Sequence, residues 1–163
     1  MPAQIGHLHL VCGYICAGKS TLTKSLADAP QTLRISEDQW LKTLFGPEMN
    51  GLGDYITYAT RLQTLLHTHV SDLLTTGVNV VLDFPANTVK QRSWMKALIE
   101  QTGCPHTLHH LDVPLTTCKQ RLQIRNAQMT HEFQVTDAQF DQVSAHFTNP
   151  DPSEGFNIAV HGA

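Results

Sequence analysis

The sequence contains few charged residues, and few of those are basic. Only 15% of its 163 residues are Asp, Glu, Lys or Arg, whereas about 25% is typical of soluble proteins. Lys and Arg number 11 against 14 Asp and Glu, which gives a formal net charge of -3. This balance argues against a broad basic surface for duplex nucleic acid or anionic lipid. The position of each Lys and Arg is therefore informative.

Long apolar runs and closely paired cysteines are also missing. No stretch approaches the roughly 18 apolar residues of a membrane helix, and no basic segment precedes the first apolar stretch, as it would in a secretory signal. The four cysteines, Cys12, Cys16, Cys104 and Cys118, show no Cys-x-x-Cys spacing, which favours reduced thiols. These absences predict a cytoplasmic protein without a membrane partner.

Hydrophobic residues make up 41% of the chain, which is enough for a core, and the length predicts a single domain spanning residues 1–163. Strands are predicted at residues 7–12, 33–36, 78–83, 107–113 and 156–161, and helices at residues 19–27, 54–74, 89–101, 116–127 and 137–147. Residues 46–53 and 149–155 are predicted to be loops. The alternation of strands and helices predicts an α/β fold with a mainly parallel sheet.

One segment matches a phosphate-binding motif completely. Residues 13–20 fit the pattern G-x-x-x-x-G-K-[ST] and lie between a predicted strand and a predicted helix. The glycines let backbone N–H groups turn towards phosphate oxygens, and the helix N-terminus adds the positive end of its dipole. Lys19 would reach the β- and γ-phosphates, and Ser20 would supply a hydroxyl ligand for Mg²⁺. The predicted nucleotide-binding residues of this segment are Gly13, Tyr14, Ile15, Cys16, Ala17, Gly18, Lys19, Ser20 and Thr21.

Such a motif requires an acidic residue at the end of a neighbouring strand. Asp83 follows the apolar residues 80–82, and we expect it to hold the Mg²⁺ shell, either directly or through a water. Asp83 could instead only cap the turn that Phe84 and Pro85 begin.

A second pair of acids follows the second predicted strand. Strand ends of this kind lie at the ligand-binding crevice of a parallel sheet. There Asp38, or its rival Glu37, could accept a proton from a substrate hydroxyl. Alternatively, Ser36 is a helix N-cap and the two acids favour the first turn. Both interpretations can hold at once.

Arg121 and Arg125 are four residues apart and share one face of a predicted helix. Phosphoryl transfer needs cations near the transferred group, and the polar residues 128–134 that follow have the composition of a mobile lid. The pair could equally lie on a solvated helix face. Arg92 follows the Asp83 strand and could face the substrate.

Ten histidines are present, but their spacing does not indicate a metal site. His67 and His69 do not stack on one helix face, and His109 and His110 point to opposite sides of a strand. We therefore expect no zinc or iron site.

Taken together, residues 13–20, 36–38, 80–84 and 118–126 with Arg92 resemble the small P-loop kinase-like proteins known as AAA domain or zeta-toxin-like, which include chloramphenicol phosphotransferase, gluconate kinase and polynucleotide 5′-kinase domains. The resemblance implies a three-layer P-loop NTPase fold with a parallel five-stranded sheet of order 2-3-1-4-5 and a small helical lid. It also implies ATP and Mg²⁺ as cofactors, Asp38 as the base, and Arg121 and Arg125 near the ATP phosphates. Residues 85–87, Pro-Ala-Asn, depart from the family pattern of Gly and bulky aromatics, so the acceptor stays open.

The sequence thus predicts an ATP-dependent kinase that moves the γ-phosphate to a hydroxyl of a small-molecule acceptor. Its predicted catalytic residues are Lys19, Asp38, Arg121 and Arg125, its metal-binding residues Ser20 and Asp83, and its substrate-binding residues Asp38 and Arg92. The alternatives are a nucleotide-binding switch or slow ATPase without an acceptor, a polynucleotide end kinase, and a zeta-like toxin kinase. The low Lys and Arg content disfavours nucleic acid as a partner.

Overall fold

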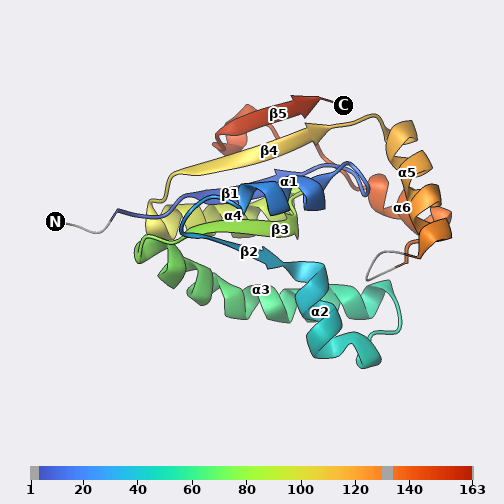
Figure 1. The fold of residues 1–163 in the computed structure, drawn as a ribbon, viewed down its shortest axis with the longest axis horizontal. Helices are drawn as coiled ribbons and strands as arrows, with labels where there is room; N and C mark the ends of the chain where they lie inside the picture. Colours follow the sequence, from blue (N-terminus) through green and yellow to red (C-terminus); the bar gives the residue numbers. More distant parts are fainter. Residues whose placement is uncertain (1–3, 130–133, 163) are drawn as a thin grey trace.

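A computed structural model describes residues 4–129 and 134–162. Its centre is a five-stranded parallel sheet of order β2-β3-β1-β4-β5 (Figure 1). The strands are β1 (Leu8–Cys12), β2 (Thr32–Ser36), β3 (Asn79–Pro85), β4 (His106–Asp112) and β5 (Ile158–Gly162). The predicted fold class and strand order are therefore confirmed.

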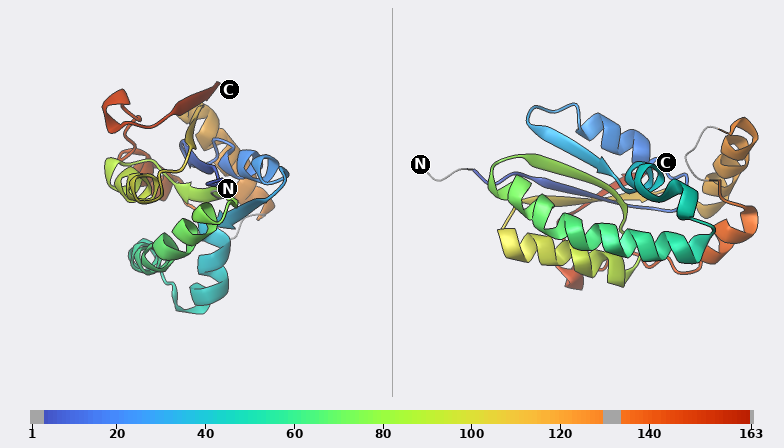
Figure 2. Two further views of the ribbon diagram at one scale, coloured as in Figure 1. Left: turned by 90° about the vertical axis from the view of Figure 1, so that its left-hand side faces the viewer. Right: turned by 90° about the horizontal axis from the view of Figure 1, so that it is seen from below.

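Helices cover both faces of this sheet and its carboxyl end. Helix α1 lies on one face, whereas α3 and α4 lie on the other (Figure 2). Helices α5 and α6 lie beyond the end at which the strands finish (Figure 1). The helices are α1 (Lys19–Leu26), α2 (Glu37–Phe45), α3 (Leu52–Thr75), α4 (Val89–Thr102), α5 (Leu115–Gln128) and α6 (Asp137–Ser144), with 3₁₀ turns η1 (Gly46–Glu48) and η2 (Pro152–Glu154).

The main core lies between the sheet and α3 and α4. Leu8 and Leu10 of β1 and Leu82 of β3 are fully buried there, facing the apolar stripe of α3 that includes Leu66 and Val70. A second cluster, around Leu111 and Phe140, joins the end of β4 to α5 and α6. Because β1 and β3 are buried on both faces, the sheet fixes the positions of their carboxyl ends.

Most differences from the sequence prediction concern helix boundaries. Ser36 caps α2, its hydroxyl accepting a bond from the Gln39 N–H at 3.4 Å, so the capping interpretation of this segment is correct. The expected loop at residues 46–53 contains η1 and the first residues of α3, and the last predicted helix ends at Ser144 rather than at residue 147. The proposed lid, residues 128–134, falls mostly outside the described residues.

None of the helices in the described ranges is long and apolar enough to cross a membrane.

Four histidines line one face of the sheet across three strands. His9 Nδ1 lies 3.0 Å from His109 Nε2, and His109 Nδ1 lies 2.9 Å from His161 Nε2. The ring of His7 lies 4.4 Å from that of His9. Neutral imidazoles can form this row of hydrogen bonds, because each ring supplies one donor and one acceptor. Among the described residues no group of three or more His, Cys, Asp or Glu could hold a metal.

These contacts predict that the protein is destabilised by mild acid. Burial, followed by neighbouring imidazoles, lowers the pKa of His9 and of His109 to about 4, whereas both titrate near 6.5 once unfolded. Between these pH values the unfolded chain binds protons that the folded protein excludes, so stability falls as pH drops from about 7 towards 4. Since both rings are partly accessible, we expect a total loss of about 2 kcal/mol.

Urea unfolding at pH 7.5 and pH 5 would measure this loss. His109→Gln should reduce the pH dependence, whereas His69→Gln, on an exposed part of α3, should leave it as in the unmodified protein. Equal pH dependence in both variants would contradict the prediction.

Candidate functional site

The glycine-rich segment forms a loop between β1 and α1. Gly13 is closely packed, because a Cβ there would lie 3.1 Å from the carbonyl oxygen of Leu111 and from the Ala17 side chain. Cys16 and Gly18 have positive φ angles of 66° and 104°, which turn the backbone back towards α1. Gly18 precedes α1 without any side-chain cap, and the first turn carries no acid. The uncapped N–H groups of this turn are therefore suited to bind an anion.

Lys19 extends along this loop rather than into solvent. Its Nζ donates to the carbonyl oxygens of Gly13 and Tyr14, both at 2.6 Å. Burial lowers the pKa of Lys19 to about 8, while Asp83 and nearby cysteines oppose that effect. The ammonium group is thus held at the mouth of the loop, where an added anion would favour its charged form.

Ser20 and Asp83 come together at the start of α1. The Ser20 hydroxyl donates to Asp83 Oδ2 at 3.4 Å. Sequence analysis missed Arg34, which pairs with the same oxygen and whose Nε donates to Thr23 Oγ1 at 2.9 Å. Arg34 occupies a polar position inside β2, and this was the only signal for its role. A hydroxyl beside a carboxylate is a donor set that suits Mg²⁺, with Arg34 fixing the orientation of the carboxylate.

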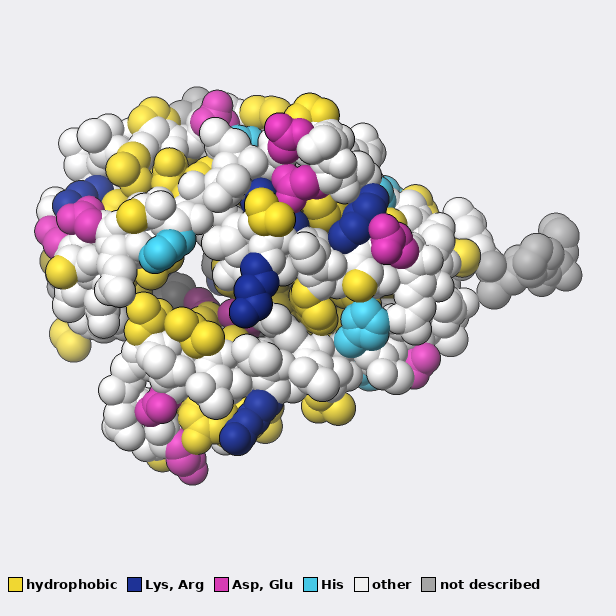
Figure 3. Space-filling view, turned by 180° about the vertical axis from the view of Figure 1, so that it is seen from behind, with side chains coloured by type: hydrophobic (Ala, Val, Ile, Leu, Met, Phe, Trp, Pro, Cys, Tyr) yellow, Lys and Arg dark blue, Asp and Glu magenta, His cyan; other side chains and the backbone are white. Residues whose placement is uncertain are grey.

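Asp38 lies beside this pair because of the strand register. Ser36 is aligned with Asp83 in the parallel pairing of β2 and β3, so the acids that follow Ser36 begin α2 at the same edge of the sheet. Asp38 Oδ1 lies 2.7 Å from the hydroxyl of Tyr55 on α3. The surface at this end of the molecule is hollowed, with acidic side chains at the base of the hollow (Figure 3).

Glu37, the rival candidate, is buried behind Asp38 with only 1% of its surface exposed. Its carboxyl group contacts the Tyr55 hydroxyl at 2.8 Å and the Gln63 amide at 3.2 Å. Burial raises the pKa of Glu37 to about 7, the two hydrogen bonds oppose that rise, and Asp38 and Asp83 add to it. The more accessible Asp38 is therefore better placed to meet a substrate.

The two arginines of α5 point back at the glycine-rich loop. Arg121 Nη1 donates to the Cys16 carbonyl at 3.3 Å. Arg125 Nε is buried and has no hydrogen-bond partner among the described residues. Burial raises the pKa of the Cys16 thiol, but the positive charges of Arg125, Lys19 and Arg121 oppose that rise. Three cations thus converge on one loop.

Arg92 does not lie where the sequence prediction placed it. Its side chain is fully buried, and its Nε donates to Glu154 at 2.8 Å. The Nη1 group donates to the carbonyls of Ala86 and Thr148 at 3.0 and 2.9 Å. Nη2 lies 3.5 Å from the Asn149 carbonyl oxygen. These contacts tie α4 to the chain segment that follows α6, and the fully buried side chain is not accessible to a substrate. Its expected substrate role is replaced by a structural one.

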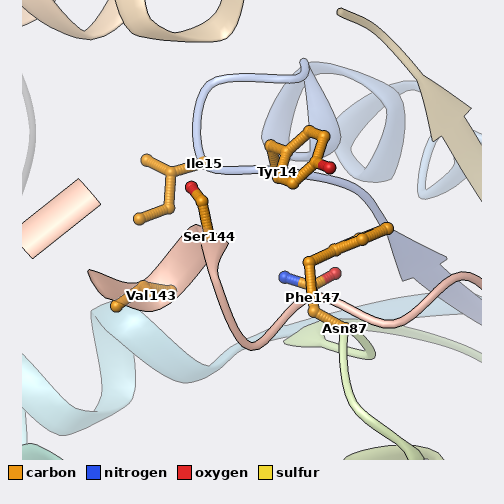
Figure 4. Close-up of a pocket in the computed structure, with 6 residues that line it drawn as sticks. All are labelled: Tyr14, Ile15, Asn87, Val143, Ser144 and Phe147. Atoms are coloured by element: carbon orange, nitrogen blue, oxygen red, sulfur yellow. The ribbon is translucent and has the colours of Figure 1, made fainter. Parts of the chain in front are cut away.

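Asn87 and Phe147 close the other side of the loop (Figure 4). Asn87 Oδ1 accepts a hydrogen bond from the Gly13 N–H at 2.9 Å, and the ring of Phe147 lies 4.5 Å from that of Tyr14. The cavity that they share with Ile15, Val143 and Ser144 measures about 10 Å³, which holds about one water molecule. Asn87, in the segment that departs from the family pattern, therefore supports the loop, and an acceptor must bind outside this cavity.

The residues present fit a nucleoside triphosphate with a divalent cation. The uncapped turn of α1, the Lys19 ammonium and the unpartnered Arg125 Nε suit phosphate oxygens. Ser20 and Asp83 suit the cation.

A model of the AAA domain family matches residues 8–150 of the chain. The chain belongs to this family. It has the P-loop kinase-like fold that the resemblance of the motifs implied. No curated protein matches it.

Solved structures share this fold at low sequence identity. Kti12 of Chaetomium thermophilum with ADP-AlF3 has a TM-score of 0.73 at 13% identity, over 95% of this chain and 88% of that chain. The APS kinase CysC of Mycobacterium tuberculosis, with AMPPNP and APS, has a TM-score of 0.62 at 16% identity, over 96% and 88%. A chain of the Pnkp1/Rnl/Hen1 RNA repair complex has a TM-score of 0.68 at 17% identity, over 88% and 44%. At these identities the comparisons establish the P-loop fold alone.

Proposed function

We propose that the protein is an ATP-dependent phosphotransferase that moves the γ-phosphate of ATP to a hydroxyl group of a small-molecule acceptor. One observation carries this proposal. The site contains two distinct carboxylates at the same edge of the sheet. Asp83 is paired with Ser20 as a donor set for the cation, and Asp38 is a second carboxylate outside that pair. A nucleotide switch has no need of this second carboxylate, whereas a kinase needs a base for the acceptor hydroxyl.

Each residue of the site has a distinct task in this reaction. The loop N–H groups, Lys19, Arg121 and Arg125 bind the phosphates and stabilise the negative charge on the transferred group. Ser20 and Asp83 would hold Mg²⁺, which would supply electrostatic stabilisation of the phosphates. Asp38 takes the proton of the acceptor hydroxyl while that oxygen bonds to the γ-phosphorus and the bond to the ADP oxygen breaks.

The distribution of basic residues supports a small acceptor over a polynucleotide. All 11 Lys and Arg residues lie within the described ranges. Arg34, Arg92 and Lys119 are paired with carboxylates, and three further cations converge on the glycine-rich loop. A nucleic-acid path needs a row of available cations, and six of the 11 are already engaged in these two ways, which supports a small acceptor.

Replacement of Asp38 by Asn tests the role of the base. We expect phosphoryl transfer to fall at least about a hundredfold, because general-base catalysis commonly contributes a factor of this order. ATP affinity should stay close to that of the unmodified protein, because Lys19 and the uncapped N–H groups at the start of α1 are unchanged. Asp72→Asn, at an exposed position of α3, is the control. Full transfer activity in the Asp38 variant would refute the assignment.

An ATP-consumption screen would identify the acceptor class. Sugars, antibiotics, nucleosides, nucleotide sugars and oligonucleotides would be tested, with the Lys19→Ala variant as the background measurement. A phosphorylated product formed only by the unmodified protein supports the proposal. Hydrolysis of ATP with no phosphorylated product from any compound supports the slow ATPase instead.

A further inference from the structure

A single tyrosine hydroxyl lies between the two carboxyl groups at the start of α2. Tyr55 Oη is 2.8 Å from Glu37 Oε1 and 2.7 Å from Asp38 Oδ1. All three side chains are held by secondary structure, Glu37 and Asp38 in the first turn of α2 and Tyr55 in α3. The three groups therefore form a fixed unit.

Counting hydrogen atoms limits the protonation states of this unit. The Tyr55 hydroxyl carries one hydrogen, and an ionised carboxylate can only accept. Both short contacts are hydrogen bonds only if a second hydrogen is present, and that hydrogen must be on a carboxyl group. Glu37 is the group to carry it, because Glu37 is almost fully buried whereas Asp38 is partly exposed, and burial disfavours the charged form.

The neighbours of Glu37 agree with a neutral carboxyl group. From α3 it faces the Tyr55 hydroxyl and the uncharged amide of Gln63. From α2 and β3 it faces the acids Asp38 and Asp83. Arg34 is bound to Asp83 instead, and no Lys or Arg is among the groups that shift the pKa of Glu37 or of Tyr55.

We propose that Tyr55 is a positioning residue for Asp38, in a hydrogen-bond chain in which neutral Glu37 donates to Tyr55 and Tyr55 donates to ionised Asp38. This inference rests on the proposed role of Asp38 as the base. The hydrogen-bond chain fixes the orientation of the Asp38 carboxylate through its Oδ1. It also keeps a second negative charge away from Asp38.

The test uses hydrolysis of Mg·ATP, in which water takes the place of the unidentified acceptor. Tyr55→Phe should lower turnover about ten- to a hundredfold, because a misplaced catalytic group commonly costs this much, and the KM for ATP should stay the same. Tyr58→Phe, one turn further along α3 and stacked on Phe45, should have no effect on turnover. Equal turnover in the two variants would overturn the proposal.

The pH profile separates positioning from mere structural support. As pH rises above about 7, Glu37 ionises and competes with Asp38 for the Tyr55 hydrogen, so turnover of the unmodified protein should fall. In Glu37→Gln the side-chain NH₂ keeps donating to Tyr55 at all these pH values, and this fall should disappear. The profile is measured at saturating ATP and between pH 6 and 8, so that loss of the Lys19 charge does not limit nucleotide binding. A fall in this range that persists in Glu37→Gln would count against the hydrogen-bond chain.

Carbon-13 NMR of the side-chain carboxyl groups gives a readout that does not depend on activity. At pH 6, Glu37 should still be protonated in the nucleotide-free protein, whereas ordinary Glu residues are ionised, with a pKa near 4.3. An ionised Glu37 at pH 6 would overturn the proposal even if Tyr55→Phe failed to fold. If Glu37 is protonated but Asp38→Asn retains full turnover, the hydrogen-bond chain stands and the assignment of Asp38 as the base is refuted.

Discussion

Replacement of Lys19 by Ala should lower ATP-dependent turnover about 10²–10³-fold, the usual cost of removing one donor that stabilises transition-state charge. Lys19 already lies along the phosphate-binding loop, with its ammonium group 2.6 Å from two loop carbonyls. Alanine removes the positive charge but leaves the loop N–H groups in place. Nucleotide affinity, measured by calorimetry, should therefore weaken less than turnover does.

The pH dependence of ATP binding provides a second test of Lys19. Burial lowers the pKa of its ammonium group to about 8, so the free protein loses this charge as pH rises above that value. ATP affinity should decline in the same range, and Lys19→Ala should abolish the decline. Lys24→Ala, at the exposed end of α1, is the matched control. If Lys19→Ala and Lys24→Ala had equal turnover, the role of Lys19 would be refuted.

Replacement of Arg92 by Ala should destabilise the fold by about 3–5 kcal/mol, the usual cost of removing one partner of a buried ion pair. The change would leave Glu154 and the carbonyls of Ala86 and Thr148 without their shared donor. It would also leave a cavity beneath α4, since Arg92 is among the largest fully buried side chains. Urea unfolding, followed by circular dichroism, would measure the loss.

Arg61→Ala is the comparison for this variant. Arg61 lies 5.5 Å from the centre of the Tyr58 ring on the outer part of α3, and contacts of this kind contribute about 0.5–1 kcal/mol at exposed sites. A loss of stability in Arg92→Ala no larger than that in Arg61→Ala would contradict the structural role. It would reopen the question of a substrate role for Arg92.

Local sequence patterns predicted the elements of the fold well. The motif at residues 13–20 is continuous in sequence, and its neighbouring strand and helix follow from local apolar periodicity. The strand order came from the resemblance to a known family, because periodicity does not state which strands are neighbours. The helix after Ser36 was foreseen only as a capping pattern, since it is short and its first turn is acidic.

The functional site was predicted less completely because its contacts join residues far apart in sequence. Arg34 and Asp83 are both visible as polar residues in or after strands, but their pairing depends on the register of β2 and β3. Tyr55 carries no sequence signal at all, since it is one aromatic residue in a long amphipathic helix. Its hydroxyl reaches Glu37 and Asp38 only because α3 packs beside α2.

The contacts of the histidines and of Arg92 also could not be predicted from local sequence. Composition revealed ten histidines, but only strand alignment places His9, His109 and His161 in contact. Arg92 has the same local sequence whether it faces a substrate or the protein interior. The packing of residues 148–154 against α4 decides between them.

The sequence by itself thus determined the phosphate-binding loop and the α/β class, because both depend on residues close together in the chain. The scarcity of cations, noted first, drew attention to each Lys and Arg, and Lys19, Arg121 and Arg125 do lie near one loop. It did not indicate the contacts of Arg34 and Arg92. Tertiary structure alone decided these roles, as well as the assembly of Glu37, Tyr55 and Asp38. A side chain's partner is set by which strands and helices are adjacent, and that information is absent from any local stretch of sequence.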